Sequence, residues 1–271
     1  MKHIHALLAL LALALLLMGC EKVIDVDLNE ANPQIVIEAN LMAGVHDFQV
    51  QVTQTASYFE AAAPTPVEDA TVTLTGSDGS SATLSYQANG IYMAPAFEGV
   101  PGTQYTLEVT ANGTTYTGLS TMPVSVQLDS LYSEFAPAQP PFFPEDGYTL
   151  FLVFQDPPVV SNYYRAILTL NGVTTSDYFL IDDELTDGNL VEIPFFGQQF
   201  ELEDEVSIEF RSLDAPTFQY FETLSELTGG GGGPGGGPGA AAPGNPDNNL
   251  SGGALGYFSA WSSDQFSTTI Q

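Results

Sequence analysis

Apolar residues recur along most of the chain with a period close to two. Because successive side chains of a strand point to opposite faces of a sheet, this period predicts strands that bury one face. The pairs Asn89-Gly90 and Asn112-Gly113, which favour the positive φ of tight turns, separate some of these stretches. We expect about six to eight strands over residues 23–122, as is typical of an immunoglobulin-like β-sandwich. Clear examples are 34–38, 48–52, 70–74 and 104–109.

The second half of the chain is also mainly β. Residues 124–131 look like a strand that crosses into a second domain, which we place at 126–271. The fold class is therefore mainly β, with an N-terminal sandwich followed by a second β-rich domain that holds one short helix. Its expected strands lie near 148–154, 163–170, 190–193, 200–202, 206–212, 254–262 and 266–270.

One stretch of the second domain has the signals of a helix. Asp214 is a suitable N-cap, Pro216 follows within the first turn, and the helix is expected to stop at Thr228 before a run of glycines. The apolar positions recur three residues apart, which predicts one buried helix face. These positions are Phe218, Phe221, Leu224 and Leu227.

Residues 229–246 read GGGGGPGGGPGAAAPGNP, a low-complexity tract. Such a sequence has too little apolar surface to offset the entropy lost on ordering, so we predict a flexible loop within the C-terminal domain. We interpret it as a tolerated surface insertion. The functional alternative is a mobile lid over a binding site.

The N-terminus has the pattern of a bacterial lipoprotein signal peptide. A positive end with Lys2 precedes an unbroken apolar stretch at 6–18, which is too short to span a bilayer. The stretch ends in Leu-Met-Gly19-Cys20, which resembles a lipobox, where the chain is cut between Gly19 and Cys20. We expect residues 1–19 to be removed and Cys20 to carry a diacylglycerol and an N-acyl chain. These chains would hold the domain at 20–125 permanently at a membrane.

Charge excludes several classes of partner. The chain has 33 acidic residues but only 4 lysines and arginines, for a net charge of −29. Such a surface cannot neutralise phosphates, which excludes sequence-independent nucleic-acid binding and disfavours anionic lipid headgroups. A solubility surface, a cation-binding surface and adaptation to a saline habitat all remain open.

Several segments together resemble domain-of-unknown-function family 4249, whose members are outer-membrane lipoproteins of the Bacteroidota. The resemblance implies a lipoprotein facing the periplasm or the cell surface, often encoded beside a TonB-dependent transporter, and it implies no activity. The long Gly/Pro tract and the scarcity of lysine depart from the family pattern. The segments that carry the resemblance are 20–28 (CEKVIDVDL), 162–165 (NYYR), 182–188 (DDELTDG), 245–246 (NP) and 253–260 (GALGYFSA).

The reactive side chains are too few for most catalytic sites. Once residues 1–19 are removed, His46 is the one histidine that remains, and we expect it to be exposed in a turn. There is no free thiol, no nucleophile elbow and no usual zinc or copper ligand set, while Lys22 lies beside the anchor. We therefore expect a non-enzymatic protein without a resident cofactor. A carboxylate-dependent glycan hydrolase remains a less favoured alternative, since paired acids suffice for that reaction.

Two groups of residues are weak candidates for binding. Carboxylate oxygens are ligands that Ca²⁺ prefers, so an acidic turn is a calcium candidate, although its spacing is not that of an EF-hand. Arg165 and Arg211 lie in β patterns among acids, where a structural ion pair is the first expectation and recognition of a carboxylate or phosphate is the alternative. The residues of the acidic turn are Asp182, Asp183, Glu184 and Asp187.

Aromatic residues occur as doublets along the predicted strands. In a strand such a doublet places one ring in the core and one outside, so we expect core packing or an interaction surface rather than a sugar site. The function we expect is an accessory or ligand-capturing partner of a TonB-dependent transporter; the alternative is a structural or adhesive envelope lipoprotein. The doublets are Phe142-Phe143, Tyr163-Tyr164, Phe195-Phe196, Tyr220-Phe221 and Tyr257-Phe258.

Overall fold

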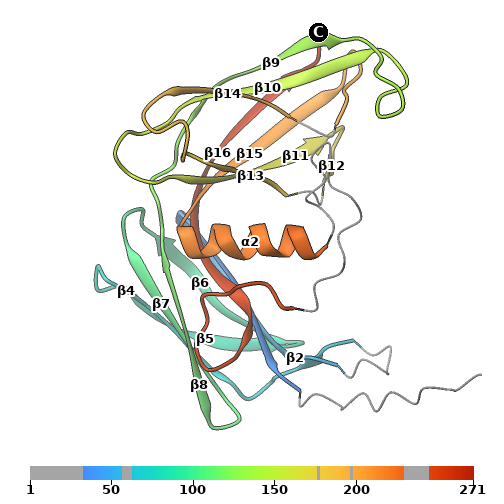
Figure 1. Ribbon diagram of the computed structural model, residues 1–271. Helices are drawn as coiled ribbons and strands as arrows, with labels where there is room; N and C mark the ends of the chain where they lie inside the picture. Colours follow the sequence, from blue (N-terminus) through green and yellow to red (C-terminus); the bar gives the residue numbers. More distant parts are fainter. Residues whose placement is uncertain (1–32, 57–62, 176–177, 196–197, 229–243) are drawn as a thin grey trace, which may run out of the picture. The chain divides into compact units, whose positions relative to one another are not determined.

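The computed structural model describes residues 33–56, 63–175, 178–195, 198–228 and 244–271. The signal peptide, Cys20 and residues 229–243 of the Gly/Pro tract lie outside these ranges. Strands dominate the described part, with a single helix, α2, which confirms the mainly β fold class (Figure 1). No helix in this part is long and apolar enough to cross a membrane. The predicted division of the chain near residue 125 stays a prediction.

Thirteen strands form one extended sheet, in the order β12-β11-β15-β16-β1-β2-β6-β5-β4-β7-β8, with β13 added to β11 and β3 to β2. A separate sheet has the order β14-β10-β9. The strands of the first half are β1 (Ile35–Met42), β2 (Gly44–Gln54), β3 (Thr65–Pro66), β4 (Thr71–Gly76), β5 (Ser81–Ala88), β6 (Ile91–Gly99), β7 (Gln104–Ala111) and β8 (Thr114–Thr121). Those of the second half are β9 (Leu128–Ala136), β10 (Gly147–Gln155), β11 (Tyr163–Leu170), β12 (Val173–Thr174), β13 (Phe179–Asp182), β14 (Leu190–Pro194), β15 (Glu205–Leu213) and β16 (Leu255–Thr269).

Strand β16 belongs to both halves. Its first part pairs in parallel with β1, and its last part pairs antiparallel with β15. The prediction of two strands at 254–262 and 266–270 is wrong, because Ser263 and Asp264 continue the ladder opposite Arg211 and Phe210. Neither residue interrupts a strand as glycine or proline would.

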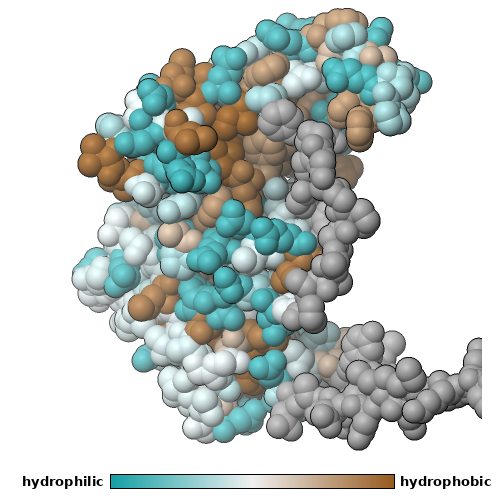
Figure 2. All heavy atoms as spheres, in the orientation of Figure 1, coloured by the Kyte–Doolittle hydropathy of each residue, from teal (hydrophilic) through white to brown (hydrophobic). Residues whose placement is uncertain are grey.

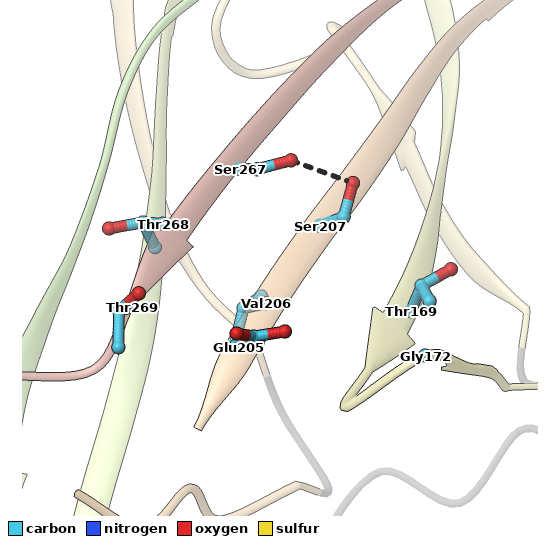
Figure 3. A pocket seen from close by; sticks show the side chains of 8 residues that line it. All are labelled: Thr169, Gly172, Glu205, Val206, Ser207, Ser267, Thr268 and Thr269. Carbon is cyan, nitrogen blue, oxygen red and sulfur yellow. Dashed lines mark hydrogen bonds between the residues drawn. The ribbon is translucent and has the colours of Figure 1, made fainter. Parts of the chain in front are cut away.

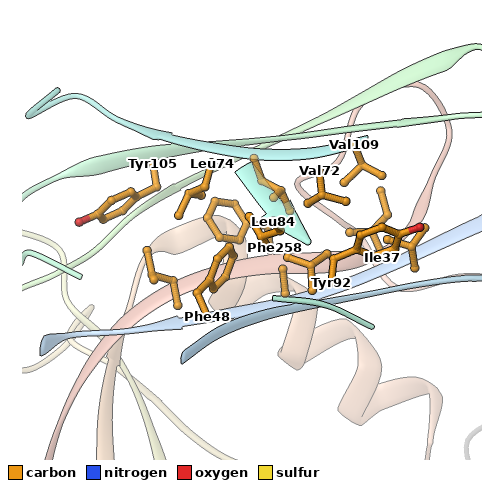
Figure 4. Packing of buried hydrophobic residues seen from close by; sticks show 14 of the residues in the cluster. Ile37, Phe48, Val72, Leu74, Leu84, Tyr92, Tyr105, Val109 and Phe258 are labelled. Carbon is orange, nitrogen blue, oxygen red and sulfur yellow. The ribbon is translucent and has the colours of Figure 1, made fainter. Parts of the chain in front are cut away.

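The first core lies between β1, β2 and β6 on one side and β4 and β7 on the other. Figure 4 shows Ile37, Phe48 and Tyr92 facing Leu74 and Val109 across this interior. All five are almost completely buried, as the alternation in the sequence predicts. The predicted turns are present too, since Asn89, Gly90, Asn112 and Gly113 all have positive φ.

The second core lies between β10 and the sheet that contains β11 and β15. Phe154 packs on Tyr164 and Phe210, with ring centroids 5.1 and 4.8 Å away. The predicted strand at 200–202 is wrong: Phe200 forms only an isolated bridge to Tyr148, and residues 202–203 make a turn. The strand predicted at 124–131 begins only at Leu128.

Helix α2 (Ala215–Leu227) confirms the helix prediction closely. Asp214 is the N-cap and accepts from the backbone N–H of Thr217, Pro216 stands in the first turn, and Thr228 is the C-cap. The Asp214 carboxylate also accepts from the Ser120 hydroxyl and the Thr121 N–H. The cap therefore ties the helix to the end of β8 as well as starting it.

Candidate functional site

Arg165 and Arg211 are direct neighbours across two strands. The antiparallel register of β11 and β15 places them opposite each other. Arg211 makes the expected ion pair, with its Nη2 atom 2.9 Å from Glu209 Oε2. Arg165 makes no ion pair with any residue that the structure describes. Like charges directly opposite in a sheet repel each other, so this arrangement is costly without an anion.

Aromatic rings hold both guanidinium groups in place. The Arg165 guanidinium carbon lies 4.4 Å from the ring centre of Phe221 in α2 and 4.7 Å from that of Tyr178. The guanidinium carbon of Arg211 lies 3.9 Å from the ring centre of Trp261 in β16. Cation–π contacts of this kind fix the orientation of a guanidinium without consuming its hydrogen-bond donors.

Buried polar atoms without a hydrogen-bond partner concentrate at this place. Within the described ranges there are five such side-chain atoms. Four lie on the sheet face that carries the two arginines, and the fifth lies in the first turn of α2. Such atoms are rare in folded proteins, and each calls for a physical explanation. They are Arg165 Nε, Arg211 Nε, Ser259 Oγ, Trp261 Nε1 and Thr217 Oγ1.

Burial lowers the pKa of Arg165, and the positive charge of Arg211 lowers it further. The guanidinium still stays protonated at physiological pH, because arginine titrates far above it. The cluster therefore presents two adjacent cations in a chain whose net charge is −29. Only three lysines and arginines follow residue 20 in the sequence, and two of them, Arg165 and Arg211, form this cluster.

The same face of the sheet continues into a hydroxyl-lined pocket. Residues two apart on a strand share a face, so Glu209 and Ser207 follow Arg211 along β15. The Ser207 hydroxyl oxygen accepts two hydrogen bonds from β16, one from Gln265 Nε2 at 3.1 Å and one from Ser267 Oγ at 3.0 Å. The pocket has a volume of about 400 Å³ (Figure 3). Its lining residues are Thr169, Gly172, Glu205, Val206, Ser207, Ser267, Thr268 and Thr269.

A second hollow of about 440 Å³ lies on the sheet face at β1, β2 and β6. Tyr257 connects it with the arginine cluster: its hydroxyl bonds with the Asn40 side chain at 2.9 Å, and its ring lies 5.1 Å from that of Phe221. Burial raises the pKa of Tyr257. The hollow is lined by Glu38, Asn40, Asp47, Gln49, Gln51, Ile91 and Tyr257.

The acidic turn is only partly assembled as the sequence suggests. Asp183 and Asp187 come together with Asp156, and one carboxylate oxygen of each lies within 4.8 Å of the others. Asp182 and Glu184 do not join them: Asp182 Oδ1 accepts from the backbone N–H of Glu184, and both side chains are exposed. Calcium binding stays a prediction, and a calorimetric titration without heat at millimolar calcium would remove it.

Hydrogen bonds to these aspartates tie two loops together. Asp156, which is fully buried, accepts from the Tyr164 hydroxyl at 2.6 Å and from the Gly188 N–H at 3.0 Å. Asp183 accepts from the Asn162 N–H at 2.8 Å. In the same way Asp187 accepts from Val159 N–H at 2.7 Å. Loops 157–162 and 183–189 are thereby fixed side by side.

These loops display unusually exposed apolar side chains, and together with the first residue of β14 we name them the docking loops. Leu185 is 93% exposed and Val159 is 89% exposed, while Val160 and Leu190 are each more than half exposed. Val159 also has a φ of +79°, which is strained for a β-branched residue. In Figure 2 apolar surface gathers over the region of β10, β13 and β14, beside hydrophilic patches.

His46 lies in β2 rather than in a turn, so that prediction is wrong. The strand begins at Gly44, and a bulge between His46 and Phe48 shifts its pairing with β6. The side chain is exposed, as expected. Among the described residues no serine or cysteine forms a hydrogen bond with it.

Two aromatic doublets divide between the two faces of a strand as expected. Tyr164 and Phe258 are buried in the cores, whereas Tyr163 and Tyr257 point to the other face and contact α2. Tyr220 and Phe221 are both buried, since the helix turns both towards the sheet. Phe196 lies outside the described residues.

Comparison with known proteins identifies the family of the chain. Among solved structures, a two-domain fibronectin type III segment of chicken tenascin is similar with 10% identity and a TM-score of 0.23, covering 67% of this chain and 91% of that one. No curated protein matches the chain significantly. The profile of a domain of unknown function, DUF4249, matches residues 21–267, almost the whole length that follows Cys20. The chain therefore belongs to the DUF4249 family.

Proposed function

We propose that this chain is a non-enzymatic lipoprotein of the bacterial outer membrane that captures a ligand and serves as an accessory of a TonB-dependent transporter. The lipobox-like end at Gly19-Cys20 supports the anchor. The exposed, isolated His46 and the absence of a nucleophile-base pair among the described residues support a binding role over catalysis.

The docking loops are the observation that carries the partnership. Contiguous exposed apolar surface on a folded protein marks a contact site. Here Val159 and Leu185 stand on loops that hydrogen bonds to Asp156 and Asp187 hold in place, so little entropy is lost when a partner covers them. Exposed acids Asp182, Glu184 and Asp187 surround them and suit a partner whose rim is basic.

The test is an affinity pull-down of the tagged, lipidated protein from its own outer membranes in mild detergent, followed by mass spectrometry. We expect a large β-barrel in near-equal amount. The double variant Val159→Ser, Leu185→Ser should lose it, while Val124→Ser, at a side chain 71% exposed elsewhere, should keep it. Recovery without a barrel, or equal recovery by all three proteins, contradicts the proposed partnership.

A structural or adhesive envelope lipoprotein is the second candidate, and the same apolar loops favour it. Such loops can contact a neighbouring cell surface as well as a transporter. Cell adhesion that depends on salt or calcium, disappears in the serine double variant and occurs in cells without the transporter supports this candidate instead.

A further inference from the structure

The geometry points to a carboxylate-bearing carbohydrate as the ligand, with its carboxylate held between Arg165 and Arg211 and its hydroxyl groups laid along β15 and β16. This inference rests on the ligand-capturing part of the proposed function. It does not depend on the transporter partnership.

The first step concerns the charge of the ligand. Arg165 has no ion-pair partner among the described residues, and Arg211 has one, Glu209. Two guanidinium groups opposite each other on neighbouring strands repel each other, and Glu209 offsets only one of the two positive charges. A bound anion relieves this repulsion. Anion binding would also explain why two of the few basic residues of the chain lie next to each other.

The second step concerns the type of anion. A guanidinium presents its N–H groups as a planar fork that matches the two oxygens of a carboxylate. The chain carries a net charge of −29, and Glu209 stands beside Arg211. A singly charged carboxylate suffers less repulsion from these acids than a doubly charged phosphate does. The cluster therefore favours a carboxylate.

The third step concerns the body of the ligand. From Arg211 the shared face leads through Glu209 and Gln265 to Ser207, with Ser267 and Thr169 on either side of it and Glu205 beyond. Ile167, opposite Glu209, is the apolar side chain on this path. The Cα atoms of Arg211 and Ser207 are separated by about 13 Å of strand. Hydroxyl, amide and carboxylate groups along this length can all form hydrogen bonds with a molecule that carries many hydroxyl groups.

An extended peptide fits this place less well. Peptides that add to a sheet need a strand edge with unused backbone groups. Strand β15 lies between β11 and β16, and both ladders use its backbone. Only side chains face the ligand here, which favours a sugar acid over a peptide.

The test is isothermal titration of the full-length protein in mild detergent and low salt, without a transporter. The probes are trisaccharides that end in a single galacturonate, mannuronate or guluronate, with neutral galactotriose as the control. We expect at least one of the uronate-ended trisaccharides to bind and the neutral trisaccharide not to bind. Failure of all three uronates at millimolar concentration, or equal binding of galactotriose, overturns the inference but leaves the pull-down result untouched.

Three variants locate the site. Arg165→Gln with Arg211→Gln should weaken the bound uronate about tenfold or more, and Arg165→Lys should weaken it less, since it keeps the charge without the fork. Glu209→Gln should bind a few-fold more tightly, because the competing carboxylate is gone. If the double variant does not fold, the other two still decide. Unchanged affinity in both would overturn the site.

Discussion

Gly256 in β16 lies so close to the backbone carbonyl of Ile37 in β1 that no side chain fits between them. Its φ of +91° is also one that residues with a Cβ atom rarely adopt. This close approach occurs where β16 pairs with β1, and so where the strand shared by both halves joins the first one.

Gly256→Ala should therefore lower the free energy of unfolding by about 3 kcal/mol or more, since it combines a backbone clash with a strained φ. Gly253→Ala is the matched control, because Gly253 has a φ of +76° but open space around it. It should cost only about 1 kcal/mol. Urea unfolding measures both, and equal losses would contradict the role given to the Ile37 contact.

Asp214→Ala should destabilise the protein by about 2 kcal/mol. The variant removes the cap of α2 and leaves the Ser120 hydroxyl and the Thr121 N–H without their acceptor. Glu222→Ala, on the exposed side of the same helix, should change stability by no more than ~0.5 kcal/mol. Thermal unfolding of both variants checks this, and similar melting temperatures would show that the Asp214 cap does not contribute to stability.

Tyr164→Phe should cost about 1 to 3 kcal/mol, because it removes one of the two hydrogen bonds that the buried Asp156 carboxylate accepts and leaves only the one from the Gly188 N–H. The same change at the neighbouring Tyr163, whose ring faces α2 instead, should cost less than ~0.5 kcal/mol. Proteolysis between residues 157 and 162 should become faster only in the first variant. Loops equally resistant in both variants would argue against bracing by Asp156.

Stability should fall at alkaline pH. Burial raises the pKa of Tyr220 to about 12, above the ordinary value of 10.0. Below pH 10 the tyrosine is protonated in both states and stability is fully present. Between pH 10 and about 12 the unfolded state loses its proton first, so about 2 to 3 kcal/mol is lost as pH rises.

Tyr220→Phe should flatten this part of the stability curve, as measured by urea unfolding at several pH values. Lysine contributes little in this range, since the chain contains only Lys2 and Lys22. A curve as steep as that of the unsubstituted protein would mean that Tyr220 does not contribute to the alkaline loss of stability.

Local patterns in the sequence predicted much of the fold. The cap, proline and apolar spacing around Asp214 define α2 almost to the residue, because each signal acts within one or two helical turns. The alternation of apolar and polar residues at 200–202 predicts a strand, but it is too short to be specific, and Phe200 forms only an isolated bridge. The continuity of β16 depends on pairing with two distant strands, which no local pattern contains.

The candidate site was visible only in parts. Arg165 and Arg211 stood out as rare bases, but their position opposite each other follows from the register of β11 and β15. Asp156 was not predicted as a site residue, although it comes two residues after a predicted strand and directly before two prolines. The contacts of Arg165 with α2 come from tertiary packing and have no signal in the sequence.

The anchor at Cys20 is the central claim of this account, and membrane partition of Cys20→Ala tests it most directly. Cells that express the native chain or the variant are labelled with radioactive palmitate, and their outer membranes are washed with carbonate. We predict that the native protein is labelled and stays in the pellet, whereas the variant is unlabelled and soluble. A Cys20→Ala protein that still pellets with the membranes after the wash would contradict the account.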